Sequence, residues 1–186
     1  MRKFLALLLV CVMVLGLFAG CGNNGGNETT PPTTEATVQG DIVILFTNDV
    51  HTYIDGVLSY DVIAAVKEEL QKQYEYVLLV DAGDHAQGTA YGSMDKGETI
   101  IELMNAAKYD VATLGNHEFD YGMDGAMNII EWAEYPYVSA NFYHEENGVK
   151  GETVLAPYVI FEFGGEKVAI LGITTPESFT KSTPAY

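Results

Sequence analysis

The chain has 186 residues and a formal net charge of −17 at pH 7, with 26 acidic side chains against nine Lys or Arg. Arg2 and Lys3 are the only charged residues among the first 20, so the rest of the chain carries −19, has no arginine, and is unsuited to binding nucleic acid through its phosphates. An anionic substrate would have to be attracted by locally bound cations, because the overall field repels it.

Residues 1–20 have the pattern of a secretory signal peptide, with two basic residues, an apolar run over 4–18 and small residues after it. A membrane-spanning helix is the alternative, but the run is shorter than the roughly 20 apolar residues that a bilayer helix needs. Phe18-Ala19-Gly20-Cys21 resembles a bacterial lipobox, although Leu17 lies one place before the usual leucine position. The resemblance implies that Cys21 is lipidated and anchors the protein to the outer face of the cytoplasmic membrane, at the cell surface or in the periplasm.

Residues 21–40 are rich in Asn, Gly, Thr and Pro and show no apolar periodicity, which predicts a flexible tether. The only cysteines are Cys11 and Cys21, so the sequence beyond them excludes disulfides, zinc–thiolate sites and a cysteine nucleophile. The folded part is expected over 41–186, which is long enough for one hydrophobic core.

From residue 41 onward, strand and helix patterns alternate. We expect strands at 42–46, 76–80, 110–114 and 137–140, helices at 61–73, 100–107 and 123–133, and loops at 83–97 and 141–151. A hairpin at an antiparallel edge or in a second sheet is predicted for Val159–Phe163 and Lys167–Ile173, which Gly164-Gly165 join. The order predicts an α/β fold of layered sheet and helices, an incomplete βαβ sandwich with a mainly parallel sheet and helices on both sides.

Two helix details follow from the same pattern. In the first helix, Val62, Ile63, Val66 and Leu70 are expected to face the core, with Lys67 on the outer face. Thr99 is expected to cap the second helix.

Polar side chains follow three of the expected strands, each at its C-terminal end. In an α/β sheet this is the edge where ligands bind. Carboxylate, amide and imidazole groups gathered there indicate metal-ligand chemistry. The candidates are Asp49 and His51 after the first strand, Asp84 after the second, and Asn116, His117 and Asp120 after the third.

Each candidate has a chemical rationale and a plainer alternative. Asp49 and His51 lie two residues apart at a strand end and suit Zn, Mn, Fe or Mg-like ions, but a turn Asp and a surface His would look the same. Asp84 follows a glycine that permits a sharp turn, and one carboxylate between two cations can bridge them; the alternative is a simple turn former.

Asn116 offers a neutral amide oxygen as a weak ligand, although an Asn-His pair also caps helices. His117 is suited to proton transfer, and Asp120 can orient its imidazole. His85, beside Asp84, is expected behind the ligands or facing a phosphate, and His144 in a solvated loop.

Three segments that contain these candidates resemble the first three motifs of calcineurin-like metallophosphoesterases. The segments are Thr47-Asn48-Asp49-Val50-His51, Asp81-Ala82-Gly83-Asp84 with Gln87-Gly88-Thr89, and Gly115-Asn116-His117-Glu118-Phe119-Asp120-Tyr121-Gly122. They are most similar to the secreted 5′-nucleotidase and 2′,3′-cyclic nucleotide phosphodiesterase branch, and 168–176 is similar to its next strand. The resemblance implies two divalent metal ions and hydrolysis of nucleotides or other phosphoesters by an activated water.

By that resemblance, Asp49 and His51 would hold the first ion, Asp84 would bridge, and Asn116 would hold the second, with His117 and Asp120 as the catalytic pair. The sequence departs from the family at Thr52-Tyr53, where a small residue is common, and it lacks the two later His motifs. Residues 41–186 are therefore expected to be the N-terminal part of the catalytic domain, C-terminally truncated, which alone would bind metal weakly and turn over poorly. The rival hypothesis is a lipid-anchored solute-binding protein without catalysis. Oligomeric state is not indicated.

Overall fold

The computed structural model describes residues 40–182. The expected signal peptide, all but the last residue of the expected tether, and the lipidation site Cys21 lie outside the described residues. Within the described range, no helix combines the length and apolar character needed to cross a membrane.

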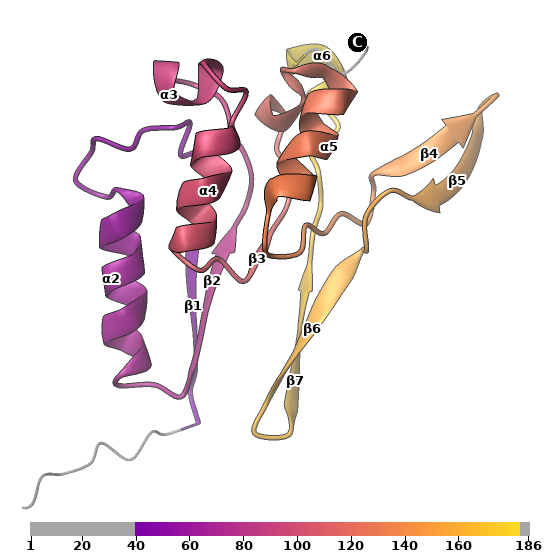
Figure 1. Cartoon of the computed structure of the whole chain (residues 1–186). Coiled ribbons are helices and arrows are strands. Elements are labelled where there is room, and N and C mark those ends of the chain that lie inside the picture. The colour runs from indigo at the N-terminus through magenta and orange to yellow at the C-terminus, as the bar shows by residue number, and fades with distance from the viewer. Residues whose placement is uncertain (1–39, 183–186) are drawn as a thin grey trace, which may run out of the picture. The chain divides into compact units, whose positions relative to one another are not determined.

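The central sheet has three parallel strands in the order β1-β2-β3 (Figure 1). They are β1 (Ile42–Thr47), β2 (Tyr76–Asp81) and β3 (Val111–Ala112). Because β2 is central, its apolar run is buried on both faces, as expected for a parallel sheet. The third strand is shorter than the expected 110–114, since the chain turns away to bring Gly115 against the loop after β2.

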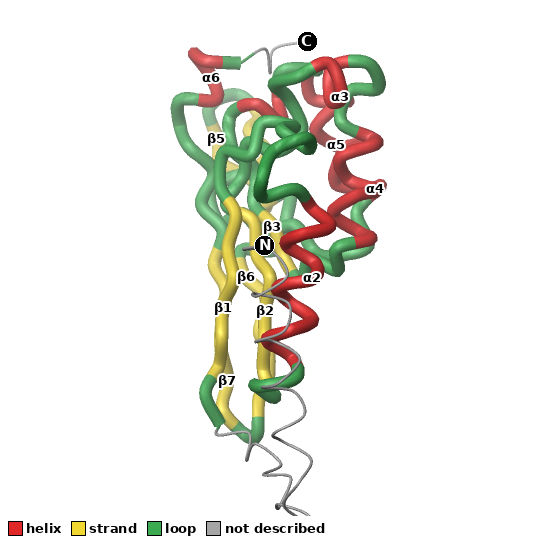
Figure 2. Tube along the Cα trace, turned by 90° about the vertical axis from the view of Figure 1, so that its left-hand side faces the viewer, coloured by secondary structure: helices red, strands yellow, loops and turns green. Residues whose placement is uncertain are grey.

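The three longer helices lie on one side of this sheet (Figure 2). They are α2 (Tyr60–Gln71), α4 (Glu98–Ala106) and α5 (Gly122–Trp132). Their apolar faces meet the sheet in a core that fully buries Leu79, Ile100, Ile101, Met104 and Ile129. The expectation of helices on both sides is wrong for residues 40–182, where the longer helices lie on one side and Ile44 and Phe46 of β1 are 45% and 74% exposed.

The α2 helix is rotated relative to the expectation. Lys67 is only 5% exposed, and its Nζ donates to Asp110 Oδ2 at 2.7 Å and to the carbonyl of Lys108. Val62 and Val66 are correspondingly exposed to solvent along one edge. Lys67 thus lies on the inner face of the helix, paired with the partly exposed Asp110, against the apolar periodicity.

The start of α4 also differs from the expectation. The cap is provided by Asp95, whose carboxylate accepts the backbone N–H groups of Gly97 and Thr99 at 3.1 and 3.0 Å. The Thr99 hydroxyl donates to the same carboxylate. Thr99 therefore lies inside the first turn and does not cap the helix.

Two antiparallel hairpins follow the helices. The expected one is confirmed as β6 (Tyr158–Phe163) and β7 (Glu166–Leu171), with positive φ at both turn glycines. A second, β4 (Tyr143–Glu146) with β5 (Val149–Thr153), replaces most of the expected loop at 141–151. Its turn is Asn147-Gly148, both at positive φ, the residue pair that two-residue hairpin turns favour.

The remaining elements are short. The expected strand at 137–140 makes only isolated parallel bridges, Ala112 to Tyr137 and Val138 to Ala156. The expected loop at 83–97 contains the one-turn helix α3 (Ala90–Ser93). The 3₁₀ turn η1 (His117–Phe119) follows β3, and α6 (Ser178–Lys181) is the last described helix.

Candidate metal centre

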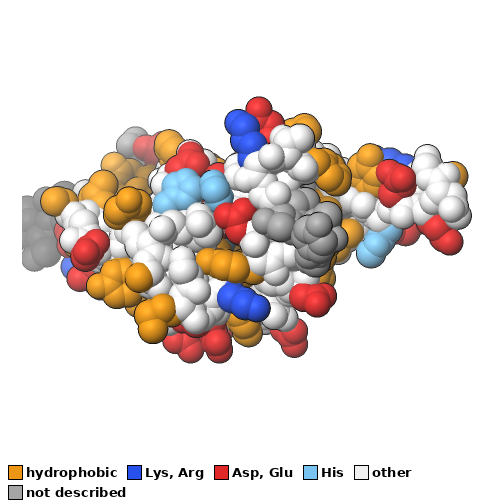
Figure 3. Space-filling view, turned by 90° about the horizontal axis from the view of Figure 1, so that it is seen from above, with side chains coloured by type: hydrophobic (Ala, Val, Ile, Leu, Met, Phe, Trp, Pro, Cys, Tyr) orange, Lys and Arg blue, Asp and Glu red, His pale blue; other side chains and the backbone are white. Residues whose placement is uncertain are grey.

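Side chains from the loops after β1, β2 and β3 meet at the C-terminal edge of the sheet. One potential ligand atom from each of His51, Asp84 and His117 lies within 4.8 Å of the others. The ring centroids of His51 and His117 are 4.8 Å apart, edge to face. Viewed from this end of the sheet, histidine side chains lie together at the surface with acidic side chains beside them (Figure 3).

The loop after β1 is held by the loop after β2. The N–H groups of Asp49 and His51 donate to the carbonyls of Gly83 and Asp84 at 3.1 and 2.9 Å, and both residues have positive φ. His51 Nδ1 lies 3.0 Å from the carbonyl of Gln87, so Nδ1 donates a proton there and Nε2 is the nitrogen left to bind a cation. Asp49 Oδ1 lies 3.6 Å from that Nε2, at the exposed rim of the cluster.

Asp84 occupies the centre and has a positive φ of 59°. Its Oδ1 accepts the backbone N–H of His117 at 2.7 Å. Burial raises the pKa of the Asp84 carboxyl, and the nearby charge of Glu118 raises it further, so a bound cation would stabilise the anion. A Cβ on Gly115 would lie 2.3 Å from Asp84 Oδ1, and one on Gly83 would lie 2.3 Å from the nitrogen of Gly115, so both glycines are needed for this close approach.

The loop after β3 provides an oriented imidazole. His117 Nδ1 lies 2.7 Å from Asp120 Oδ2, which leaves Nε2 as the nitrogen of the cluster. Burial alone lowers the pKa of His117, but hydrogen bonding and charge from Asp120 outweigh it and raise the pKa above its ordinary value. Asn116 precedes the 3₁₀ turn without a side-chain capping bond, so its amide has no capping role here.

His85 lies beneath the site with no exposed surface. Its Nδ1 is 2.7 Å from Asp81 Oδ1 and its Nε2 is 2.7 Å from the hydroxyl of Tyr137. Burial by itself lowers the pKa of His85, but the charges of Glu118 and Asp81 raise it to about 9. With both ring nitrogens bonded to the protein, His85 supports the loop from behind and does not face a phosphate.

Sequence reasoning missed Glu118 and the role of Thr52. Glu118 is fully buried and accepts four backbone N–H groups of the loops after β2 and β3. Charged residues are seldom fully buried, so composition gave no signal beyond its place next to His117. Thr52 is also fully buried, and its Oγ1 accepts the N–H of Thr89 at 2.7 Å, which ties the loop after β2 beside His51.

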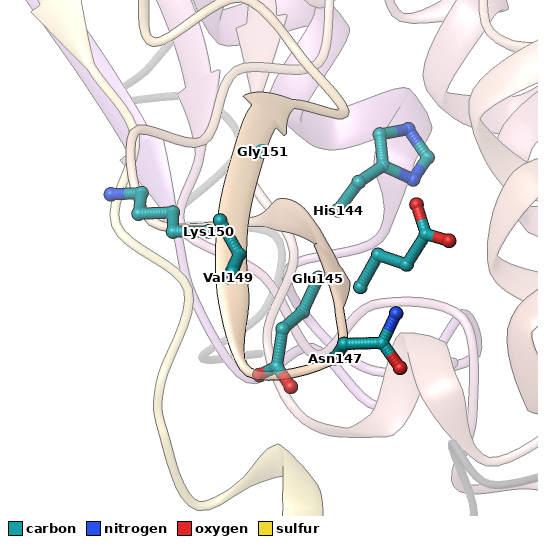
Figure 4. Close-up of a pocket in the computed structure, with 7 residues that line it drawn as sticks. His144, Glu145, Asn147, Val149, Lys150 and Gly151 are labelled. Carbon is teal, nitrogen blue, oxygen red and sulfur yellow. The ribbon is translucent and has the colours of Figure 1, made fainter.

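A separate hollow lies on the β4–β5 hairpin (Figure 4). His144 lies on β4 rather than in a loop, and it is exposed as expected. The residues around it are also exposed, and among residues 40–182 only the cluster of His51, Asp84 and His117 gathers three potential metal ligands. Imidazole and carboxylate donors at that cluster fit Zn, Mn or Fe.

Comparisons with known proteins identify the family. A family model described as calcineurin-like phosphoesterase matches residues 42–184. The snake venom 5′-nucleotidase of Crotalus adamanteus is 37% identical over 161 residues, which cover 77% of this chain and 27% of that protein. The NAD 5′-nucleotidase of Haemophilus influenzae is 31% identical over 158 residues, covering 77% and 26%.

Solved structures give the same result. The Haemophilus influenzae NAD nucleotidase has a TM-score of 0.68 at 31% identity, covering 77% of this chain and 28% of that one. The 5′-nucleotidase precursor from Thermus thermophilus has a TM-score of 0.67 at 32% identity, covering 77% and 30%. The chain therefore spans only about a quarter to a third of the length of these similar proteins.

Proposed function

Since the chain belongs to the calcineurin-like phosphoesterase family, we propose that it forms the N-terminal part of a catalytic domain that hydrolyses nucleotides with divalent metal ions. The observation that carries the proposal is the convergence of His51, Asp84 and His117 from three separate loops. The rival, a lipid-anchored solute-binding protein, is not favoured, because the family and the similar proteins are phosphoric ester hydrolases.

We assign the ligands from the family's motifs, and two of them, His51 and Asp84, lie in the observed cluster. Asp49 and His51 would hold one ion, Asp84 would be shared, and Asn116 would hold a second through its amide oxygen. When bound, two divalent cations would lower the pKa of a water molecule towards neutrality and offset negative charge on the phosphoryl oxygens. They would also supply the local positive charge that a chain of −17 otherwise lacks for an anionic substrate.

The protein's own catalytic contribution would come from His117. Because Asp120 accepts from Nδ1, the proton on Nε2 of the imidazolium is directed towards the cluster. From there Nε2–H would donate to a phosphoryl or leaving-group oxygen as negative charge develops on it. Asp120 would hold the ring orientation and stabilise the imidazolium.

The substrate class follows from the similar proteins, which are named 5′-nucleotidases and an NAD 5′-nucleotidase. We propose nucleoside 5′-monophosphates as substrates, with 2′,3′-cyclic nucleotides as a second class. Lipidation of Cys21 after removal of residues 1–20 would place the reaction outside the cytoplasmic membrane.

The test is phosphate release by the protein expressed from its complete reading frame, with Mn²⁺ or Zn²⁺ added to AMP or 2′,3′-cyclic AMP. Asp84→Asn and His117→Asn should each abolish most turnover. The matched control is Asp124→Asn, which changes an exposed carboxylate on α5 and should retain full activity. Wild-type rates in both site variants would refute the assignment.

A further inference from the structure

The carboxylate of Glu118 joins the two loops that carry the central ligand and the catalytic imidazole. Its Oε1 accepts the N–H groups of His85 and Ala86 at 2.9 and 3.1 Å. Its Oε2 accepts those of Asp84 and Gly115 at 2.9 and 2.7 Å. A carboxylate has acceptor positions for all four donors, whereas an amide side chain has only one acceptor oxygen.

The two loops bind each other reciprocally. Glu118 accepts the backbone N–H of Asp84, while Asp84 Oδ1 accepts the backbone N–H of His117 at 2.7 Å. The Asp84 carboxylate is thereby fixed in orientation, with Oδ1 engaged by the protein. Asp84 Oδ2 makes no hydrogen bond within residues 40–182 and remains the oxygen available to cations.

The backbone of Asp84 needs this support because its φ of 59° lies in the left-handed region. A residue with a Cβ adopts that conformation less readily than glycine does. Two hydrogen bonds hold it there: its N–H donates to Glu118, and its carbonyl accepts the N–H of His51.

The negative charge of Glu118 favours cation binding at Asp84, as its hydrogen bonds do. The Glu118 carboxylate is fully buried, and His85 Nε2 lies 3.7 Å from Oε1. Glu118 thus places negative charge directly behind the Asp84 loop, where it favours a cation on the open side.

We propose that Glu118 is a positioning residue that sets the orientation of the Asp84 carboxylate for divalent cations, an inference that rests on the proposed function. Glu118→Gln keeps the side-chain volume but leaves two of the four N–H donors facing an NH₂ group. Glu118→Asp keeps the charge but shortens the reach.

The experiment uses the 186-residue chain with Mn²⁺ as the probe. Its affinity is followed by titration, and amide hydrogen exchange is measured without metal. Glu118→Gln should bind Mn²⁺ about 10- to 100-fold more weakly, the usual effect of removing a partner behind a ligand. The amides of two or more of the four donor residues should exchange faster relative to the core amide of Leu79. Glu118→Asp should show a smaller change in the same direction.

Lys67→Met is the matched control, because it removes another buried charge that does not touch the loops. It should lower stability yet leave Mn²⁺ affinity and the relative exchange of the Asp84 and Gly115 amides unchanged. Equal effects of Lys67→Met and Glu118→Gln would reduce Glu118 to a stabilising residue and overturn the inference.

Two outcomes separate this inference from the proposed function. Rapid exchange of the Asp84 and Gly115 amides in the wild type overturns the role of Glu118, whether or not any variant folds. Slow exchange of those amides with no Mn²⁺ binding by the wild type contradicts the metal site and, with it, any positioning role towards cations.

Discussion

The imidazole rings of His51 and His117 meet with their centroids 4.8 Å apart and their planes 76° apart. His51 comes from the loop after β1 and His117 from the loop after β3, which lie on opposite sides of β2 in the sheet order. Asp84, from the loop after β2, completes the group. The site therefore depends on the close packing of the three loops that follow the three neighbouring parallel strands.

Replacing Asp84 by Asn should remove cation binding while leaving the fold intact. The Asn oxygen can still accept the N–H of His117, but the charge that attracts the cation is lost. We expect Mn²⁺ affinity to fall by more than about tenfold, measured by titration. Asp124→Asn should leave affinity unchanged, and an equal loss in both variants would indicate an effect of overall charge instead.

Adding one methyl group at Gly115 should damage the site by crowding. The new Cβ would lie 2.3 Å from Asp84 Oδ1, closer than any contact that real Cβ atoms make. Gly115→Ala should destabilise the protein by about 1–3 kcal/mol in chemical denaturation and weaken Mn²⁺ binding. Gly56→Ala is the control, because a Cβ there meets nothing within 4 Å. Normal Mn²⁺ binding by Gly115→Ala would contradict the packing described for the loops.

Neutralising Asp120 should lower the pKa of His117. The hydrogen bond and charge of Asp120 raise this pKa against the opposing effect of burial. In Asp120→Asn the largest contributions that oppose burial are lost, so an NMR titration of the metal-free protein should place the His117 midpoint at lower pH. Asp124→Asn should not move it. An unchanged midpoint in Asp120→Asn would show that the 2.7 Å contact does not form in solution.

The buried Lys67 should contribute to stability far more than an exposed lysine on the same helix. Lys67→Met leaves Asp110 with its bond from the N–H of Leu79 but without a cation. Because Asp110 is partly exposed, we expect a loss of about 1–3 kcal/mol in urea denaturation. Lys72→Met, which removes an exposed pair with Glu69, should have no measurable effect. Equal stability of the two variants would contradict the burial of Lys67.

Much of the fold was predictable because strong local patterns agree with the tertiary structure. The continuous apolar run at β2 and the glycine turn between β6 and β7 each have one clear interpretation. The apolar periodicity predicted the wrong inner face for α2, because Lys67 is buried there and pairs with Asp110. The β4–β5 hairpin was missed because its residues are almost all exposed and polar, although Asn147-Gly148 is a strong turn signal.

The sequence predicted the residues that meet at the site, but not Glu118, which holds their loops together. The cluster of His51, Asp84 and His117, and the contact of His117 with Asp120, lie where residues after parallel strands are expected to meet. Glu118 could not be found in this way, since its role depends on backbone N–H groups brought together by folding. The structure brings the side chains of the cluster together, and the roles assigned to them as metal ligands or catalytic groups remain predictions.

The most direct test of the central claim is paramagnetic line broadening by substoichiometric Mn²⁺ in the 186-residue chain. The account predicts that the ring signals of His51 and His117 and the amide signal of Asp84 broaden first. It also predicts one weak binding event, because in residues 40–182 the proposed ligands His51 and Asp84 meet in a single cluster, with His117 beside them. Broadening that begins at Glu145 and Glu146 on the exposed β4–β5 hairpin, with both histidine rings left sharp, would contradict it.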